Sequence, residues 1–278
     1  MAETLTLMAV HAHPDDEASS TGGVLAKYAA QGMRTVVVTC TNGEFGDAPG
    51  QIKPGQDGHD ELEVARLRLS ELRKSSEILG VDHLELLGYH DSGMPEWDYK
   101  DRPDAFANIP QELVAARITA LIERYRPQVV VSYDDLGLYQ HPDHVHAARS
   151  AAAAVSSSGL PAKYYQIAYR RSSWEKVMAA LRELGVETGE DAWEETPEQR
   201  AQMEAEEGRI TTTVDIRDVL TLKQEALQAH ASQIAESWFS KIPPEVSRDA
   251  FGDETFIRVT DRTGAPLPED DLFAGLRG

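Results

Sequence analysis

The sequence predicts an α/β fold: a Rossmann-like, open, mostly parallel sheet with helices on both faces, followed by a smaller C-terminal α+β portion. Short apolar runs alternate with stretches of helical periodicity along residues 1–170. Strands that alternate with helices of this length pair in parallel through right-handed crossovers. Segments rich in histidine and acid follow two of the apolar runs, where an open α/β sheet places its ligand crevice. A site is therefore expected at the carboxyl ends of the strands.

The first elements follow from the order of apolar and polar residues. Residues 5–10 are an apolar run, residues 22–31 have helical spacing and residues 35–39 are all β-branched, which predicts strand, helix and strand. Gly80 suits a helix C-cap, and Pro142 suits the first turn of a helix. The further helices expected in this half are residues 61–79, 111–125 and 143–156, and the further strands are residues 83–87, 129–132 and 164–169.

The pattern is weaker after Arg171. The elements expected there are a helix over residues 174–184, a strand over 211–216 and a helix over 219–232. An acidic stretch, residues 183–207, is interpreted as a solvated face. We expect residues 1–170 to form the catalytic core and residues 171–278 to complete the substrate pocket within one compact domain.

Composition excludes several classes of function. The chain has 27 Lys and Arg against 47 Asp and Glu, a formal net charge of −20. Surfaces that bind nucleic acid or anionic membranes need clustered basic residues, so neither partner is expected. The chain has no run of about 18 apolar residues and no signal-peptide pattern, so no membrane span is expected. Cys40 is the one cysteine, which excludes an intrachain disulfide and favours the cytoplasm, while a homo-oligomer is left open.

Two short segments carry the chemistry. Residues 11–17 (HAHPDDE) follow the first expected strand, and residues 141–144 (HPDH) follow the strand at 129–132. Either segment alone is weak, because acids and histidines are common in solvated loops. Loops that follow parallel strands leave the sheet at one edge, so these two segments can converge. Two long loops after strands, residues 43–60 and 91–108, are candidate walls of the same site.

The residue types in the two segments suit zinc. Zinc binds histidine nitrogens and carboxylate oxygens in a tetrahedral set, and a hydrolytic site keeps three protein ligands and one open position. His13, Asp16 and His144 satisfy that count. Because such a metal lowers the pKa of a coordinated water, a neighbouring carboxylate can accept the remaining proton, and Asp15 is placed for that task.

Two residues of the second segment remain. His141 can donate a hydrogen bond to a developing oxyanion or protonate a leaving amine, depending on its charge state. Asp143 can orient an imidazole from behind. The alternative for His141 is a helix-capping or surface histidine.

These segments resemble the signature of the LmbE-like, or PIG-L, zinc deacetylase superfamily. Further counterparts between them are TNGE at 41–44, RLSEL at 68–72 and LGYHDSGM at 87–94. Near the C-terminus, AHASQI at 229–234 and DLFAG at 271–275 resemble the mycothiol branch, which contains mycothiol S-conjugate amidases and N-acetylglucosaminyl-inositol deacetylases. The resemblance covers most of the chain. It implies one Zn²⁺ per chain and cleavage of an amide on a glucosamine nitrogen of a small-molecule substrate.

The resemblance also implies a role for each matching residue. The implied zinc ligands are His13, Asp16 and His144, the general base is Asp15, the general acid and oxyanion stabiliser is His141, and a mobile tyrosine that helps to stabilise the intermediate is Tyr139. The implied substrate-binding residues are Arg68 and Asp91, which hold sugar hydroxyls, and Asp47 and Met94 in the pocket. Ser20 stands near the position where a conjugate amidase is expected to have lysine, and Asp47 replaces a glutamate.

Three alternatives remain at this stage. One is deacetylation of another glycoside or natural product with the same chemistry. A second is phosphoester hydrolysis, although it usually needs more bridging carboxylates and a basic phosphate clamp. The third is a metal- or sugar-binding protein without turnover, against which Asp15 and His141 are both present.

Overall fold

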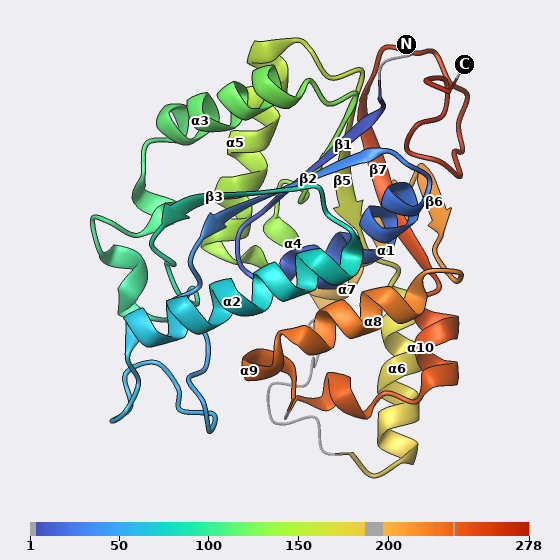
Figure 1. Cartoon of the computed structure of the whole chain (residues 1–278). Helices are drawn as coiled ribbons and strands as arrows, with labels where there is room; N and C mark the ends of the chain where they lie inside the picture. Colours follow the sequence, from blue (N-terminus) through green and yellow to red (C-terminus); the bar gives the residue numbers. More distant parts are fainter. Residues whose placement is uncertain (1–3, 187–196, 236, 278) are drawn as a thin grey trace.

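The computed structural model describes residues 4–186, 197–235 and 237–277. Within these residues the strands form one seven-stranded sheet in the order β3-β2-β1-β4-β5-β7-β6 (Figure 1). The strands are β1 (Thr6–His11), β2 (Arg34–Thr41), β3 (His83–Tyr89), β4 (Val129–Ser132), β5 (Lys163–Ala168), β6 (Thr212–Asp215) and β7 (Asp253–Asp261).

Helices cover both faces of the sheet, as predicted. On one face α1 (Asp16–Ala30), α2 (Glu61–Leu79) and α8 (Leu220–Ala229) pack against one another, and on the other α3 (Gln111–Tyr125) packs against α5 (Pro142–Ser158) (Figure 1). The remaining helices are α4 (Gly137–Gln140), α6 (Arg171–Glu183), α7 (Pro197–Glu207), α9 (Ala231–Ile234), α10 (Pro244–Ala250) and the 3₁₀ turns η1 (Asp98–Asp101), η2 (Phe106–Asn108) and η3 (Trp238–Lys241).

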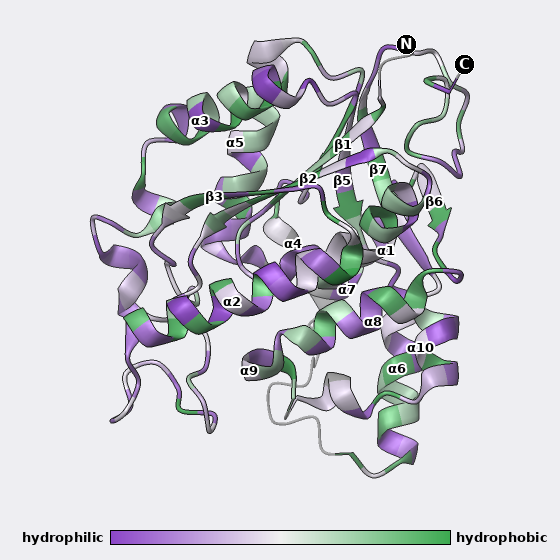
Figure 2. Ribbon diagram, viewed as in Figure 1, coloured by the Kyte–Doolittle hydropathy of each residue, from purple (hydrophilic) through white to green (hydrophobic). Residues whose placement is uncertain are grey.

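The five strands β3, β2, β1, β4 and β5 run parallel to one another. The central strand β1 is buried along its whole length, with Met8 paired to Val36 on one side and to Val130 on the other. Figure 2 shows these central strands in the colours of hydrophobic residues, while the helices carry mixed colours. A strand covered on both faces needs a continuous apolar run, which is why β1, β2 and β4 were predictable.

The N-terminal end of α1 differs from the prediction. The helix begins at Asp16, six residues before the expected start at Gly22. Its first turns are polar in sequence but buried, so their side chains do not show the apolar periodicity by which a helix is normally recognised. By contrast, α2 and α3 have the predicted bounds.

The C-terminal part adds two strands to the same sheet. The prediction missed β7, which is antiparallel and lies between β5 and β6. Its sequence, DETFIRVTD, places Glu254 at a buried position, where Lys223 compensates its charge at 2.6 Å. The helix expected over 219–232 is divided at His230 into α8 and α9. Of the acidic stretch, residues 197–207 form α7 and residues 187–196 lie outside the described residues.

The order of the strands brings the two motifs together. β1 and β4 are adjacent and parallel, and each leads into one of the histidine-rich segments at the same edge of the sheet. α1 and α5 then begin at this edge. No described helix is both long and apolar enough to cross a lipid bilayer.

Candidate active site

The two predicted segments meet through their histidine rings. Nδ1 of His13 lies 3.2 Å from Nε2 of His144, 131 positions later in the chain. The carboxylate of Asp16 contacts both rings, with Oδ2 at 3.4 Å from His13 Nδ1 and Oδ1 at 3.4 Å from His144 Nε2. All three side chains are buried.

This geometry fits a metal ion. A tetrahedral zinc with ligand bonds of about 2.0–2.1 Å places neighbouring ligand atoms roughly 3.3 Å apart. The distance of 3.2 Å between the two imidazole nitrogens is close to this spacing, and each of the two Asp16 oxygens lies 3.4 Å from one of them. The donor set, two imidazole nitrogens and one carboxylate, is one that zinc prefers. His141 offers another nitrogen within 4.8 Å of those of His13 and His144, so three histidines form a second candidate set, and His13, Asp91 and Asp143 form a third. Asp143 is already engaged by two hydrogen bonds from Ser92, whereas Asp16 contacts both His13 and His144, which favours the predicted set.

Asp143 contacts Nε2 of His13, while Nδ1 of the same ring faces Asp16 and His144. Its Oδ2 lies 3.1 Å from His13 Nε2 and accepts the backbone N–H of Ser92 at 2.9 Å, while Oδ1 accepts the Ser92 hydroxyl. The carboxylate is completely buried. A histidine ligand that donates its second ring N–H to a carboxylate is fixed in orientation and made more basic, so Asp143 leaves Nδ1 of His13 for the metal.

Charges in the cluster are strongly coupled. Burial opposes the charged form of His13, but the carboxylates of Asp91, Asp143 and Asp16 outweigh it and raise its pKa well above the ordinary value. Burial lowers the pKa of His144 to about 4, although Asp16 opposes the shift. Burial alone would raise the pKa of Asp16, yet the neighbouring histidines hold it well below its usual range. A buried carboxylate that stays ionised among imidazoles is suited to receive a cation.

Asp15 lies at the start of α1 in a strained conformation. Its φ of 105° is in the left-handed region, which costs an ordinary residue about 1–3 kcal/mol. Its backbone carbonyl accepts the first N–H groups of α1, from Ala18 and Ser19. Its carboxylate accepts a hydrogen bond from Nη2 of Arg68 at 3.0 Å. Burial raises the pKa of Asp15 to about 6 although the Arg68 charge opposes it, and a carboxyl group in this range can act as a base near neutral pH.

A buried pair that no sequence pattern indicated supports this strained residue. Glu17 Oε2 accepts the backbone N–H of Asp15 at 3.0 Å, and Glu17 Oε1 lies 2.7 Å from Nε2 of His230 and accepts the Ser75 hydroxyl. Glu17 and His230 are both completely buried. Glu17 belongs to the first motif, but its partner stands 213 positions later, and no local pattern could have revealed the pairing.

Arg68 contacts Asp15, the predicted general base. It donates Nη1 to the Gly43 carbonyl at 2.8 Å and Nη2 to the Pro14 carbonyl at 2.7 Å, in addition to its bond to Asp15. Gly43 has a positive φ, and a Cβ there would collide with the guanidinium, so glycine is needed for this approach. The geometry places Arg68 as a support for Asp15, and its predicted contact with sugar hydroxyls stays a prediction.

His141 faces the same cluster. Its ring centroid lies 4.6 Å from that of His13 and 5.1 Å from that of His144. Burial, reinforced by the other two histidines, lowers the pKa of His141 to about 3, so the ring is neutral at pH 7. Nδ1 accepts the backbone N–H of Asp143, which places the proton of the neutral ring on Nε2. A neutral donor of this kind suits an oxyanion better than proton transfer.

The other predicted residues lie around this centre. Asp91 is buried with Oδ1 3.6 Å from His13 Nε2, and Oδ1 accepts the N–H of Gly93. Asp47 points its carboxylate at Lys53, 2.7 Å away, and Met94 is half-buried at the start of a turn. The side chain of Tyr139 lies outside the described residues. The roles of all four stay predictions.

A second tyrosine was not foreseen. The hydroxyl of Tyr133 donates to Asp16 Oδ2 at 2.7 Å and accepts the N–H of Ala12 at 2.7 Å. Its ring stacks on His144 with centroids 4.2 Å apart and an interplanar angle of 12°. Tyr133 therefore fixes two of the proposed ligands. His11, by contrast, turns away and bonds to Thr21 within α1 at 2.8 Å.

Comparison with known sequences gives a consistent result. The profile of the PIG-L family, described as GlcNAc-PI de-N-acetylase, matches residues 8–155, which include both motifs. A mycothiol S-conjugate amidase of Streptomyces coelicolor is 34% identical, over 100% of this chain and 99% of the relative. A 1D-myo-inositol 2-acetamido-2-deoxy-alpha-D-glucopyranoside deacetylase of Acidothermus cellulolyticus is 39% identical, over 98% of this chain and 95% of the relative.

Solved structures share the fold at low sequence identity. An N,N'-diacetylchitobiose deacetylase from Pyrococcus horikoshii matches with a TM-score of 0.62 and 18% identity, over 94% of this chain and 88% of the other. GalB, a 4-carboxy-2-hydroxymuconate hydratase from Pseudomonas putida, matches with a TM-score of 0.62 and 21% identity, over 95% of this chain and 100% of the other. Since the fold also serves a hydratase, it does not by itself select amide hydrolysis. The family profile and the full-length relatives show that the chain belongs to the PIG-L (GlcNAc-PI de-N-acetylase) family.

Proposed function

We propose that this protein is a zinc-dependent amide hydrolase that removes the N-acyl group from a glucosamine-type small molecule. The observation that carries the proposal is the packing of His13, Asp16 and His144 at the spacing of a tetrahedral metal site, with Asp15 beside it. Full-length similarity to an amidase and to deacetylases of glucosamine compounds supports the same reaction class.

His13, Asp16 and His144 would hold the zinc ion, one per chain. When bound, the ion would lower the pKa of a water molecule and polarise the amide carbonyl. Asp15 accepts the proton of the attacking water, because its carboxylate is a quarter exposed and its pKa lies near 6. Arg68 and Glu17 keep that carboxylate and its strained backbone in place. The same proton can then pass to the leaving nitrogen.

His141 completes the proposed machinery. Its Nε2–H donates to the oxyanion that forms on the carbonyl oxygen, since its Nδ1 is engaged with the Asp143 backbone. A general-acid role for His141 needs a charged ring, which its lowered pKa disfavours in the metal-free protein. We further propose that Tyr139 assists the oxyanion and that Arg68, Asp91, Asp47 and Met94 line the sugar site.

The first candidate substrates are mycothiol S-conjugates and N-acetylglucosaminyl-inositol, the compounds named for the relatives. Another N-acetylglucosaminide, or a homologue that binds metal or sugar without turnover, is the alternative. A mycothiol S-conjugate amidase is expected to have a lysine near position 20, but this chain has serine there, and the Ser20 hydroxyl bonds to that of Tyr169 at 2.9 Å. A cytoplasmic location remains an expectation from the sequence.

The test combines metal analysis with release of a primary amine from a panel of N-acetylglucosaminides and cysteinyl conjugates. We expect about one zinc per chain, and an Asp15→Asn variant that keeps the zinc but loses about 10²–10⁴-fold in rate. Asp270→Asn, at an exposed carboxylate outside both motifs and both long loops, is the matched control and keeps full activity. Zinc without amine release from any compound would identify a non-catalytic homologue, and full activity of Asp15→Asn would contradict the mechanism.

A further inference from the structure

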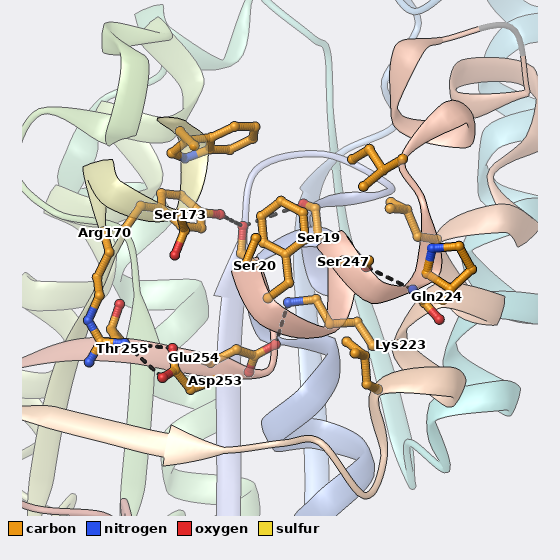
Figure 3. A pocket seen from close by; sticks show the side chains of 18 of the residues that line it. Ser19, Ser20, Arg170, Ser173, Lys223, Gln224, Ser247, Asp253, Glu254 and Thr255 are labelled. Carbon is orange, nitrogen blue, oxygen red and sulfur yellow. Dashed lines mark hydrogen bonds and ion pairs between the residues drawn. The ribbon is translucent and has the colours of Figure 1, made fainter. Parts of the chain in front are cut away.

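A cavity of about 390 Å³ lies next to the metal cluster and has no role in the chemistry described so far. It opens at the same edge of the sheet, between the end of β5, the beginning of β7 and the helices α1, α6, α8 and α10 (Figure 3). The histidines of the cluster are not among its described lining residues. Its size falls in the range of roughly 300–1,000 Å³ that is usual for small-molecule sites.

Two segments next to the active site also border the cavity. Ser19 and Ser20, which line it, stand on α1 within about one turn of the proposed ligand Asp16. Ile234 lines it from the other side, and the preceding Gln233 exchanges two hydrogen bonds with the backbone of Asp47 in an active-site loop. The cavity therefore adjoins α1 and the loop of Asp47, two segments that also border the cluster of His13, Asp16 and His144.

The charges around the cavity are compensated within the protein. Lys223 bonds to Glu254 at 2.6 Å, and Arg170 forms two bonds of 2.7 Å with Asp253 (Figure 3). Glu254 additionally accepts the backbone N–H groups of Gly23 and Val24. The described lining contains two cations and two anions, all paired, so it offers no uncompensated charge to a charged ligand.

The rest of the lining is mainly apolar. Trp174 forms edge contacts with Phe251 and Tyr169, with ring centroids 5.8 and 6.3 Å apart. Leu220 and Leu227 of α8 face the same space. Aromatic rings locked in this way form a rigid apolar wall, and burial of apolar area against it stabilises a bound hydrocarbon group.

We propose that this cavity is a subsite for an uncharged apolar group of the substrate, with space for roughly a dozen water-sized groups. The inference rests on the proposed amide hydrolysis and adds the chemistry of the group beyond the sugar. Such a group can come from the aglycone or from the acyl chain, and both sources present the same hydrocarbon surface. Ser20, which lines the cavity and bonds to Tyr169, adds no charge to it.

The experiment compares two series on the zinc-loaded enzyme. One varies the aglycone of N-acetylglucosaminides from methyl to butyl to hexyl, and the other varies the N-acyl group of the methyl glycoside from acetyl to butanoyl to hexanoyl. Each buried methylene should raise kcat/KM by about fourfold at most, and we expect a rise of at least about tenfold between the ends of one series. The series that rises identifies the source.

Ser173→Trp places a large ring in the cavity from the half-buried start of α6, and Ser173→Ala is its matched control. For each variant, kcat/KM for every compound is divided by the kcat/KM of the same variant for the N-acetyl methyl glycoside. We expect the chain-length effect to disappear in Ser173→Trp and to persist in Ser173→Ala. A flat response in both series of the wild-type enzyme, with the methyl compound still cleaved, would overturn the subsite and leave the proposed function intact.

If no compound is cleaved, the proposed function fails and the subsite is decided by binding. Calorimetry on the metal-free protein then compares the hexyl and methyl N-acetylglucosaminides and the hexanoyl and acetyl amides. Tighter binding of either longer compound, abolished by Ser173→Trp, supports the apolar subsite. Equal binding of the long and short compounds in both pairs overturns it.

Discussion

Replacing Asp143 with asparagine removes one negative charge from behind His13 and changes almost no volume. The carboxylate accepts bonds from the Ser92 backbone and hydroxyl and contacts His13 Nε2 at 3.1 Å. A hydrogen bond to a charged group contributes about 1.5–3 kcal/mol, and a neutral one about 0.5–1.5 kcal/mol. Loss of the Asp143 charge beside His13 therefore weakens metal binding by about 1–1.5 kcal/mol, which is about tenfold in the Kd for zinc.

Competition with a chromophoric zinc chelator measures this Kd for both proteins. Ser92→Ala is the control, because it removes one hydrogen bond to Asp143 but keeps the charge beside His13. We expect Ser92→Ala to change the Kd for zinc by less than Asp143→Asn does. An unchanged Kd in Asp143→Asn would refute the assignment of Asp143 as the support of a zinc ligand. An equal loss in both variants would show that packing, and not charge, controls the affinity.

Three further predictions concern metal binding, the base and the fold. Carboxylates keep His13 protonated at neutral pH in the metal-free protein, so zinc binding releases a proton, and the Kd for zinc should fall about tenfold for each unit by which the pH rises, until the pH passes the pKa of His13. Calorimetry in buffers of different ionisation enthalpy should detect the released proton, and its absence would contradict the charged His13. Glu17→Gln should lower kcat by up to about 10²-fold with zinc content retained, because glutamine has one acceptor oxygen where Glu17 uses two, one for the Asp15 N–H and one for Ser75 and His230. An unchanged kcat would remove Glu17 from the account. Lys163→Met breaks a completely buried ion pair with Glu269, and urea unfolding should show a loss of about 3 kcal/mol in the free energy of unfolding, at the low end for such pairs because Arg258 still contacts Glu269. An unchanged free energy of unfolding would show that the pair is not stabilising.

The convergence of the two histidine-rich segments could be predicted because it follows from a rule of topology. His13 and His144 each follow an apolar run of the kind that forms a buried parallel strand, and parallel strands release their loops at one edge. The residue types then indicated the chemistry. The sequence does not contain the order of the strands explicitly, but adjacent β1 and β4 are what makes the two segments converge.

The supporting residues could not be predicted in the same way. Glu17 and His230 are ordinary polar residues in their local sequence, and their pairing depends on the position of α8 and α9 against α1. Strand β7 was missed because its acids interrupt the apolar pattern, and only the fold supplies Lys223 and the α1 backbone as partners for Glu254. The pairing of buried charges that lie far apart in the chain leaves no periodic pattern in the sequence.

The most direct test of the central account measures zinc content and amine release on the same samples of wild-type protein, Asp15→Asn and His144→Ala. The account predicts about one zinc per chain and active enzyme for the wild type, one zinc without activity for Asp15→Asn, and loss of both for His144→Ala. Amine release by a His144→Ala protein that holds no metal would contradict it, because hydrolysis would then proceed without the proposed zinc site.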